Sequence, residues 1–157
     1  MVTEIPEDKN LENADLTGAI FSDRDLTGVN FWHAHLQGAD FTRSNLSEAS
    51  MAGADLTNAN FTEANLVYTN FQNANLTGAN FLDANAFGAE FGGATFAAAT
   101  FDRTDLTAAT FSGADLSGAD FTNAKFSATG VLQAIVDQDT KGLDGADLLF
   151  PETLRHR

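Results

Sequence analysis

The sequence predicts an all-β solenoid of about six coils, and three repeated features predict it. Every fifth residue from Leu11 to Phe126 is apolar, and 22 of these 24 central positions are Leu or Phe. Two residues earlier the chain prefers Ala, and Asp or Asn usually lies between the two. A period of five fits neither an α-helix nor a flat strand, so the backbone must turn a corner once per repeat.

The length of one coil follows from the polar residues two places after each central position. A coil of only two repeats would be too short to enclose a pair of Phe rings, at about 3.3 Å of chain per residue. Residues spaced by four repeats form one mostly charged set: Asp23, Arg43, Glu63, Asp83 and Arg103. The set offset by two repeats differs: Asn13, His33, Gly53, Asn73 and Gly93. Four repeats per coil therefore place residues 11–130 in six coils, roughly 29 Å tall.

The repeated unit Ala-(Asp/Asn)-(Leu/Phe)-x-x resembles the pentapeptide-repeat proteins, as in Ala54-Asp55-Leu56 and Ala74-Asn75-Leu76. The resemblance implies a right-handed quadrilateral β-helix with four short faces per coil. It also implies one possible activity, because some members imitate duplex DNA and bind type II topoisomerases such as DNA gyrase.

An open solenoid end exposes its core, so both ends should be capped. We expect residues 1–10 to form an N-terminal cap, with the Arg24 guanidinium leaving the interior through that end. Residues 131–157 are expected to form a C-terminal helical cap and tail. Val131, Leu132, Ile135 and Val136 form an apolar stripe at helical spacing, which predicts a short amphipathic helix. The apolar residues that follow could complete the cap or mediate a homodimer: Leu148, Leu149, Phe150 and Leu154.

Composition restricts the class of function. The formal charge of −14 argues against direct binding to nucleic acid and to an anionic membrane. With no cysteine and three histidines, the chain has little material for nucleophilic or acid–base chemistry. We expect no enzyme activity, cofactor or metal. Since no signal peptide or transmembrane stretch is recognisable, we expect a cytoplasmic protein.

The first candidate site is a corner that carries Trp32, His33 and His35. Stacking of one coil on the next places Asp15 and Asp55 on either side of His35. A His-x-His pair beside carboxylates could hold a zinc ion. Side chains that fan out from a convex corner rarely converge, so surface histidines in an acidic column are the alternative interpretation.

The second candidate is an apolar surface patch formed by Val67, Tyr68, Leu82 and Phe87. Equivalent positions elsewhere in the chain carry Thr or Ser. One alternative is a partner-binding patch. The other is a local shift of register that turns Phe87 inward, into the space that Ala86 leaves.

The third candidate is an acidic face. It comprises Asp23, Asp40, Glu63, Asp83, Asp102 and Asp120, and Arg43 and Arg103 interrupt it. Residues 11–130 hold 14 acidic and 4 basic residues, a net charge of −10. Duplex DNA of the same height would carry about 17 negative charges. Acidic residues also keep a solenoid with exposed edges soluble, which is the alternative explanation.

The sequence therefore predicts a non-catalytic, rigid protein-binding or structural platform whose protein target is unknown. The second hypothesis is a DNA-mimicking inhibitor or protector of a type II topoisomerase.

Overall fold

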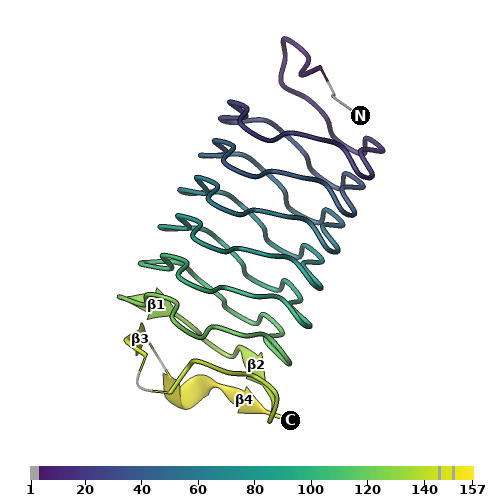
Figure 1. Ribbon diagram of the computed structural model, residues 1–157. Helices are drawn as coiled ribbons and strands as arrows, with labels where there is room; N and C mark the ends of the chain where they lie inside the picture. Colours follow the sequence, from purple (N-terminus) through teal and green to yellow (C-terminus); the bar gives the residue numbers. More distant parts are fainter. Residues whose placement is uncertain (1–3, 145, 150) are drawn as a thin grey trace.

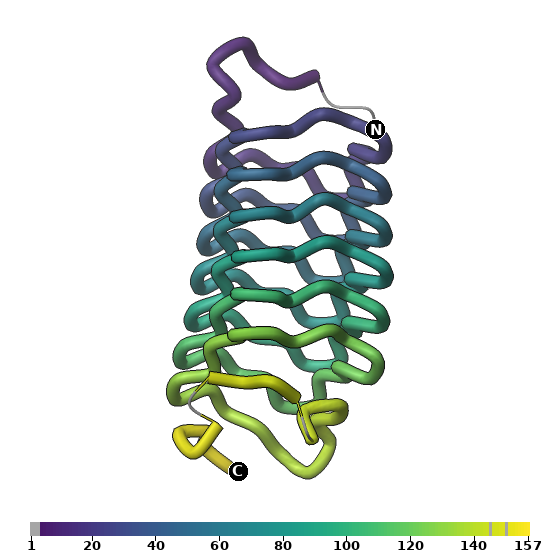
Figure 2. Tube along the Cα trace, turned by 90° about the vertical axis from the view of Figure 1, so that its left-hand side faces the viewer, coloured from purple at the N-terminus to yellow at the C-terminus, as the bar shows by residue number. Residues whose placement is uncertain are grey.

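The computed structural model describes residues 4–144, 146–149 and 151–157, and it shows a straight stack of coils (Figure 1). Parallel β-bridges join residues four repeats apart, from Asn10↔Asn30 to Thr110↔Gly130. Four columns of such bridges run along the stack, one for each repeat of a coil. Figure 2 shows successive coils lying directly over one another. The predicted all-β solenoid and its period of four repeats are confirmed.

A tight turn forms each corner. In the repeat that starts at Phe61, the Phe61 carbonyl accepts a hydrogen bond from the Ala64 N–H at 3.0 Å. The third residue of the turn, Glu63, has a φ of 56°. A positive φ at this position is typical of a type II turn. The Glu63 N–H donates to the Leu82 carbonyl at 2.8 Å, so the corner also bonds to the next coil.

Where a repeat carries Asp or Asn before its central residue, that side chain stabilises the following corner. Asn60 Oδ1 accepts hydrogen bonds from the N–H and the hydroxyl of Thr62, at 3.1 and 2.6 Å. The Asn60 Nδ2 donates to the Thr42 hydroxyl of the preceding coil at 3.0 Å. Asn80 repeats the arrangement, with its Nδ2 donating to the Thr62 hydroxyl at 3.2 Å. These polar residues therefore fix the turns and join the coils.

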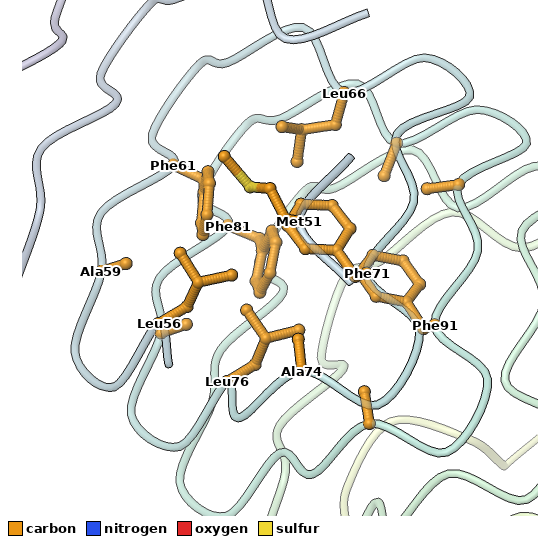
Figure 3. Close-up of a cluster of buried hydrophobic side chains, with 14 of the residues drawn as sticks. Met51, Leu56, Ala59, Phe61, Leu66, Phe71, Ala74, Leu76, Phe81 and Phe91 are labelled. Atoms are coloured by element: carbon orange, nitrogen blue, oxygen red, sulfur yellow. The ribbon is translucent and has the colours of Figure 1, made fainter. Parts of the chain in front are cut away.

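Columns of aromatic rings fill the interior (Figure 3). Phe61 and Phe81 stack nearly parallel, with ring centroids 5.0 Å apart. Phe71 meets Phe81 edge-on at 6.2 Å and stacks on Phe91 at 5.1 Å. Rings stack face to face along a column and edge to face between columns, and both are favourable geometries. All these rings are fully buried, so the large inward side chains are used in packing.

Hydroxyl side chains that replace Ala inside the coil are buried but bonded. Thr69 donates to the Leu46 carbonyl at 2.8 Å, and Thr104 donates to the Phe81 carbonyl at 2.7 Å. Both bonds cross to the preceding coil. Each hydroxyl therefore avoids the cost of an unsatisfied buried polar group.

The N-terminal segment lies beyond the first coil, at the purple end of Figure 1. Ile5 packs against the core, and the Lys9 ammonium donates to the Thr27 carbonyl at 2.8 Å. Arg24, expected to leave the interior here, is half-buried. Residues 1–3 of the predicted cap lie outside the described residues.

The predicted C-terminal helix is wrong. Residues 131–136 continue the coil instead, with Val131, Ala134 and Val136 buried at the positions that the five-residue repeat assigns to the interior. The apolar set from Val131 to Val136 matches both a helical stripe and a further repeat, and the helical interpretation was the wrong one. Among the described residues the single helical segment is the 3₁₀ helix η1, Pro151–Thr153.

Beyond Gly130 the chain adds a further, less regular coil. Strand β1 (Thr129–Gly130) pairs in parallel with β3 (Leu148–Leu149), one residue short of the regular period. Strand β2 (Ile135–Val136) pairs with β4 (Arg155–His156) at the regular period. The six predicted coils end at residue 130, but these pairings extend the stack beyond it. Leu143, Leu148 and Leu154 pack against the core of the same chain, and a homodimer through the tail stays a prediction.

A tight turn at Asp137 forms one corner of this last coil. Asp137 Oδ1 accepts hydrogen bonds from the N–H groups of Gly118 and Thr140, at 2.9 and 3.0 Å. Lys141 pairs with Asp120, one position beyond the regular period, so the turn holds one extra residue. Gly142 follows with a φ of 81°, and a Cβ there would lie 2.3 Å from the backbone of Phe121. Only glycine fits this close approach.

We predict that Ala108→Gly stabilises the protein. Ala108 is a corner residue with a φ of 58°, which disfavours any residue with a Cβ. We expect the free energy of unfolding to rise by about 0.5–1 kcal/mol in urea denaturation. The control is Ala109→Gly, at a fully buried neighbour, which should lose about 1 kcal/mol or more. Loss of stability in both variants would contradict the assignment of the corner.

A second prediction concerns acid. The Gly118 N–H, together with Thr140, holds the pKa of Asp137 below its ordinary value. A pKa lowered by folding stabilises the protein above the unfolded value, near pH 4, and this contribution is lost as pH falls through the folded value. Asp137→Asn should therefore be less stable at pH 7 and should lose less stability below about pH 4. Parallel stability profiles for the two proteins between pH 2 and about pH 7 would contradict this.

Candidate functional surfaces

The described residues contain no group of three His, Asp or Glu side chains that could hold a metal ion. They also contain no helix long and apolar enough to cross a membrane. A depression of about 430 Å³ lies at the C-terminal end, lined mainly by apolar residues such as Leu143, Leu148 and Leu154. The Asp137 carboxylate that borders it is already bonded to Gly118 and Thr140. The candidates that remain lie on the walls and corners.

The residues of the first candidate site lie in two separate places. The Trp32 and His33 rings stack on each other with centroids 5.0 Å apart, and Trp32 is 46% exposed. His33 Nδ1 lies 3.3 Å from the Gly53 carbonyl oxygen. His35 lies on the next wall, bridged to Asp15 and Asp55. His33 is thus engaged against Trp32 and Gly53, and the structure does not bring it together with His35 around an ion.

The apolar patch is exposed, and its register does not shift. Ala86 is fully buried, whereas Phe87 is 36% and Tyr68 57% exposed. The rings of Tyr68 and Phe87 contact each other edge to face at 5.7 Å. Val67 is half-buried in the same corner column as Phe87, and Leu82 is half-buried at the preceding corner. Of the two alternatives for Phe87, the inward rotation is wrong, and the ring lies on the surface.

Tyr68 occupies an unfavourable backbone conformation. Its φ is 56°, where a bulky side chain is a conformational outlier. Its ring lies over Gly88 of the next coil, and a Cβ on Gly88 would lie 2.5 Å from Tyr68 Cε1. His33 lies over Gly53 in the same way, and a Cβ on Gly53 would lie 2.4 Å from the His33 ring. At these two corners the ring is accommodated because the next residue in its column is glycine.

The acidic face is partly neutralised. Arg43 bonds to Asp23 through two contacts of 2.7 and 2.8 Å. Arg103 contacts Asp83 at 2.7 Å and Asp102 at 2.9 Å. Hydrogen bonding by Arg43 lowers the pKa of Asp23, and Arg103 does the same for Asp83. Lys141 lies 3.8 Å from Asp120. Asp40 and Glu63, the other members, form no ion pair with a described residue.

Two carboxylates that the sequence analysis did not single out lie elsewhere. Glu48 lies one coil before Tyr68 in the same corner column, and Glu90 is bridged to Asn70. Glu90 accepts a hydrogen bond from Gln72 at 2.6 Å, and neither carboxylate pairs with a described Lys or Arg. Aligning the sequence in rows of four repeats would have placed Glu48 next to Tyr68, so the signal was present.

This geometry defines a β-solenoid of five-residue repeats with a filled interior, and the comparisons agree with it. The family model "Pentapeptide repeats" matches residues 25–62, 54–93 and 89–127. The chain belongs to the pentapeptide repeat family. No curated protein sequence matches it.

Three solved structures are similar to this chain, and the first of them has the same fold. A trypsin-treated form of QnrB1, a plasmid-mediated fluoroquinolone resistance protein, is 22% identical with a TM-score of 0.58. The match covers 94% of this chain and 84% of that one. HetL, from the cyanobacterium Nostoc sp. strain PCC 7120, is 23% identical over 93% of this chain and 82% of that one, with a TM-score of 0.35. A protein of the Arabidopsis thaliana thylakoid lumen is 32% identical over 74% of this chain and 68% of that one, with a TM-score of 0.34.

We predict that Gly88→Ala costs more stability than Gly28→Ala. Both glycines occupy the same corner column with a φ near 65°, but a Cβ at Gly28 meets nothing within 4 Å. Each variant should lose about 1 kcal/mol to the backbone, and Gly88→Ala should lose further stability to the clash with Tyr68. In a Tyr68→Gly background the two costs should become equal. Equal costs in the parent protein, measured by urea unfolding, would contradict the stacking of Tyr68 on Gly88.

Proposed function

We propose that this protein is a non-catalytic platform that binds another protein through its outer walls. The observation that carries the proposal is the exposed pair of Tyr68 and Phe87. Neither ring belongs to the buried core. Exposed aromatic residues on a rigid scaffold are typical of recognition surfaces.

The interior supports a binding role. Stacked Phe rings, such as Phe81 and Phe101 at 4.6 Å, fill the space in which a substrate would have to lie. Each coil bonds to the next along its whole length, so the walls form a rigid surface. A rigid surface binds with little loss of conformational entropy.

The test is affinity capture from an extract of the source organism with two matched variants. Tyr68→Gly/Phe87→Thr removes the exposed rings with residues that the same column already carries, as at Gly28 and Thr107. Asp40→Asn/Glu63→Gln removes two charges from the acidic face. We expect one captured protein to be lost with the first variant and retained with the second. Capture that is independent of both surfaces would contradict the proposal.

A second candidate function is a DNA-mimicking binder of a type II topoisomerase such as DNA gyrase. The net charge of −14 favours it, and so does the fold shared with a fluoroquinolone resistance protein. Neutralisation by Arg43 and Arg103 weighs against it, because duplex DNA presents an unbroken row of charges.

The supercoiling activity of purified gyrase tests this second candidate. If it is correct, micromolar protein should change the rate of supercoiling or its inhibition by a fluoroquinolone. Asp40→Asn/Glu63→Gln should weaken that effect, and Tyr68→Gly/Phe87→Thr should not. No effect of the parent protein would exclude the candidate.

A further inference from the structure

We propose that one wall of the solenoid binds an extended, arginine-bearing segment of the partner protein. This aromatic wall comprises the bridge residues Asn30, Ser50, Asn70 and Glu90 with the corners on either side of them. The inference rests on the proposed platform function and names the chemistry of its partner.

The two exposed aromatic pairs border the same wall. Asn30, Ser50, Asn70 and Glu90 form one continuous column of parallel bridges. Trp32 and His33 follow that column at one corner, and Tyr68 and Phe87 precede it at the other. Three residues separate the corners, about 10 Å of extended chain. Along the solenoid axis, Tyr68 lies two coil spacings nearer the C-terminal end than Trp32, which is again about 10 Å.

These dimensions suit a short peptide. An extended chain spans at most about 3.3–3.6 Å per residue, so about five residues connect the two aromatic pairs across the wall. The surface between them presents small polar groups. Asn30, Ser50 and Asn70 are half-buried, which leaves a flat path without a bulky side chain.

The aromatic rings are held in place before any partner binds. Phe87 supports Tyr68 edge-on at 5.7 Å, and the Tyr68 ring lies over Gly88. His33 supports Trp32 at 5.0 Å and lies over Gly53. Ordering these side chains on binding therefore costs little conformational entropy.

Charge selects the partner. Glu48 and Glu90 flank the Tyr68–Phe87 pair, and neither forms an ion pair with a described residue. The Lys9 ammonium, at the N-terminal end of the solenoid, is bonded to the Thr27 carbonyl at 2.8 Å. The acidic face carries its own arginines, whereas the described residues of this wall supply rings and carboxylates without a paired cation. A guanidinium binds an aromatic face and a carboxylate together, which makes arginine the complementary side chain.

The test uses a peptide without aromatic residues, acetyl-Gly-Arg-Gly-Arg-Gly-Arg-Gly-amide, titrated at low ionic strength. The chain has a single Trp and a single Tyr, so fluorescence of Trp32 and the ring resonances of Tyr68 report binding directly. We expect saturable changes at both residues. Replacing arginine with the neutral analogue citrulline should weaken binding about tenfold or more.

Two variants locate the site, and a third is the control. Tyr68→Gly/Phe87→Thr and Glu48→Gln/Glu90→Gln should each weaken binding about tenfold. Asp40→Asn/Glu63→Gln, which removes the same number of charges elsewhere, should leave it unchanged. Equal losses with both charge variants, equal binding of the citrulline peptide, or no change at about 1 mM peptide would overturn the inference.

The outcomes also separate this inference from the proposed function. If extract capture depends on Tyr68 and Phe87 while the arginine peptide fails to bind, the platform function stands. The proposal of an arginine-bearing partner segment is then wrong. If capture depends on neither surface, the platform itself fails.

Discussion

A single backbone requirement recurs at every corner of the solenoid. From Asn13 to Gln133 the third residue of each regular turn has a positive φ, whether it is glycine or not. This conformation turns the chain at each corner, so that it returns after four repeats and each coil bonds to the next. The inward direction of the Phe and Leu columns follows, because only the residues between corners can face the interior. The core, the walls and the exposed corners all depend on this turn.

The same requirement determines what the surface can carry. A corner side chain points outward and contacts the equivalent corner of a neighbouring coil. The rings of His33 and Tyr68 lie over the next coil, whereas Arg43 and Arg103 bond to the preceding one. Large groups such as the Tyr68 ring fit where glycine follows in the column, as at Gly88. Exposed aromatic pairs are therefore confined to a few places, and two of them border one wall. The solenoid can thus vary its surface without disturbing the columns that stabilise it.

The sequence was sufficient to predict what depends on periodicity. The five-residue repeat and the row of charges at Asp23, Arg43 and Glu63 indicated the coil length. Two features could not be predicted from the sequence. Val131 to Val136 satisfies both a helical and a five-residue pattern, so sequence alone could not choose. The direction of Phe87 depends on how neighbouring columns pack around Ala86, which no linear pattern encodes.

The most direct test of the four-repeat coil uses disulfide formation, because the chain has no cysteine of its own. Asn60 and Asn80 are bridged in adjacent coils, at a spacing of about 4.8 Å that suits a disulfide. The double variant Asn60→Cys/Asn80→Cys should oxidise to an intramolecular disulfide without loss of fold, whereas Asn60→Cys/Asn75→Cys should stay reduced. Preferential crosslinking of the second pair, whose members are three repeats apart, would contradict the four-repeat coil.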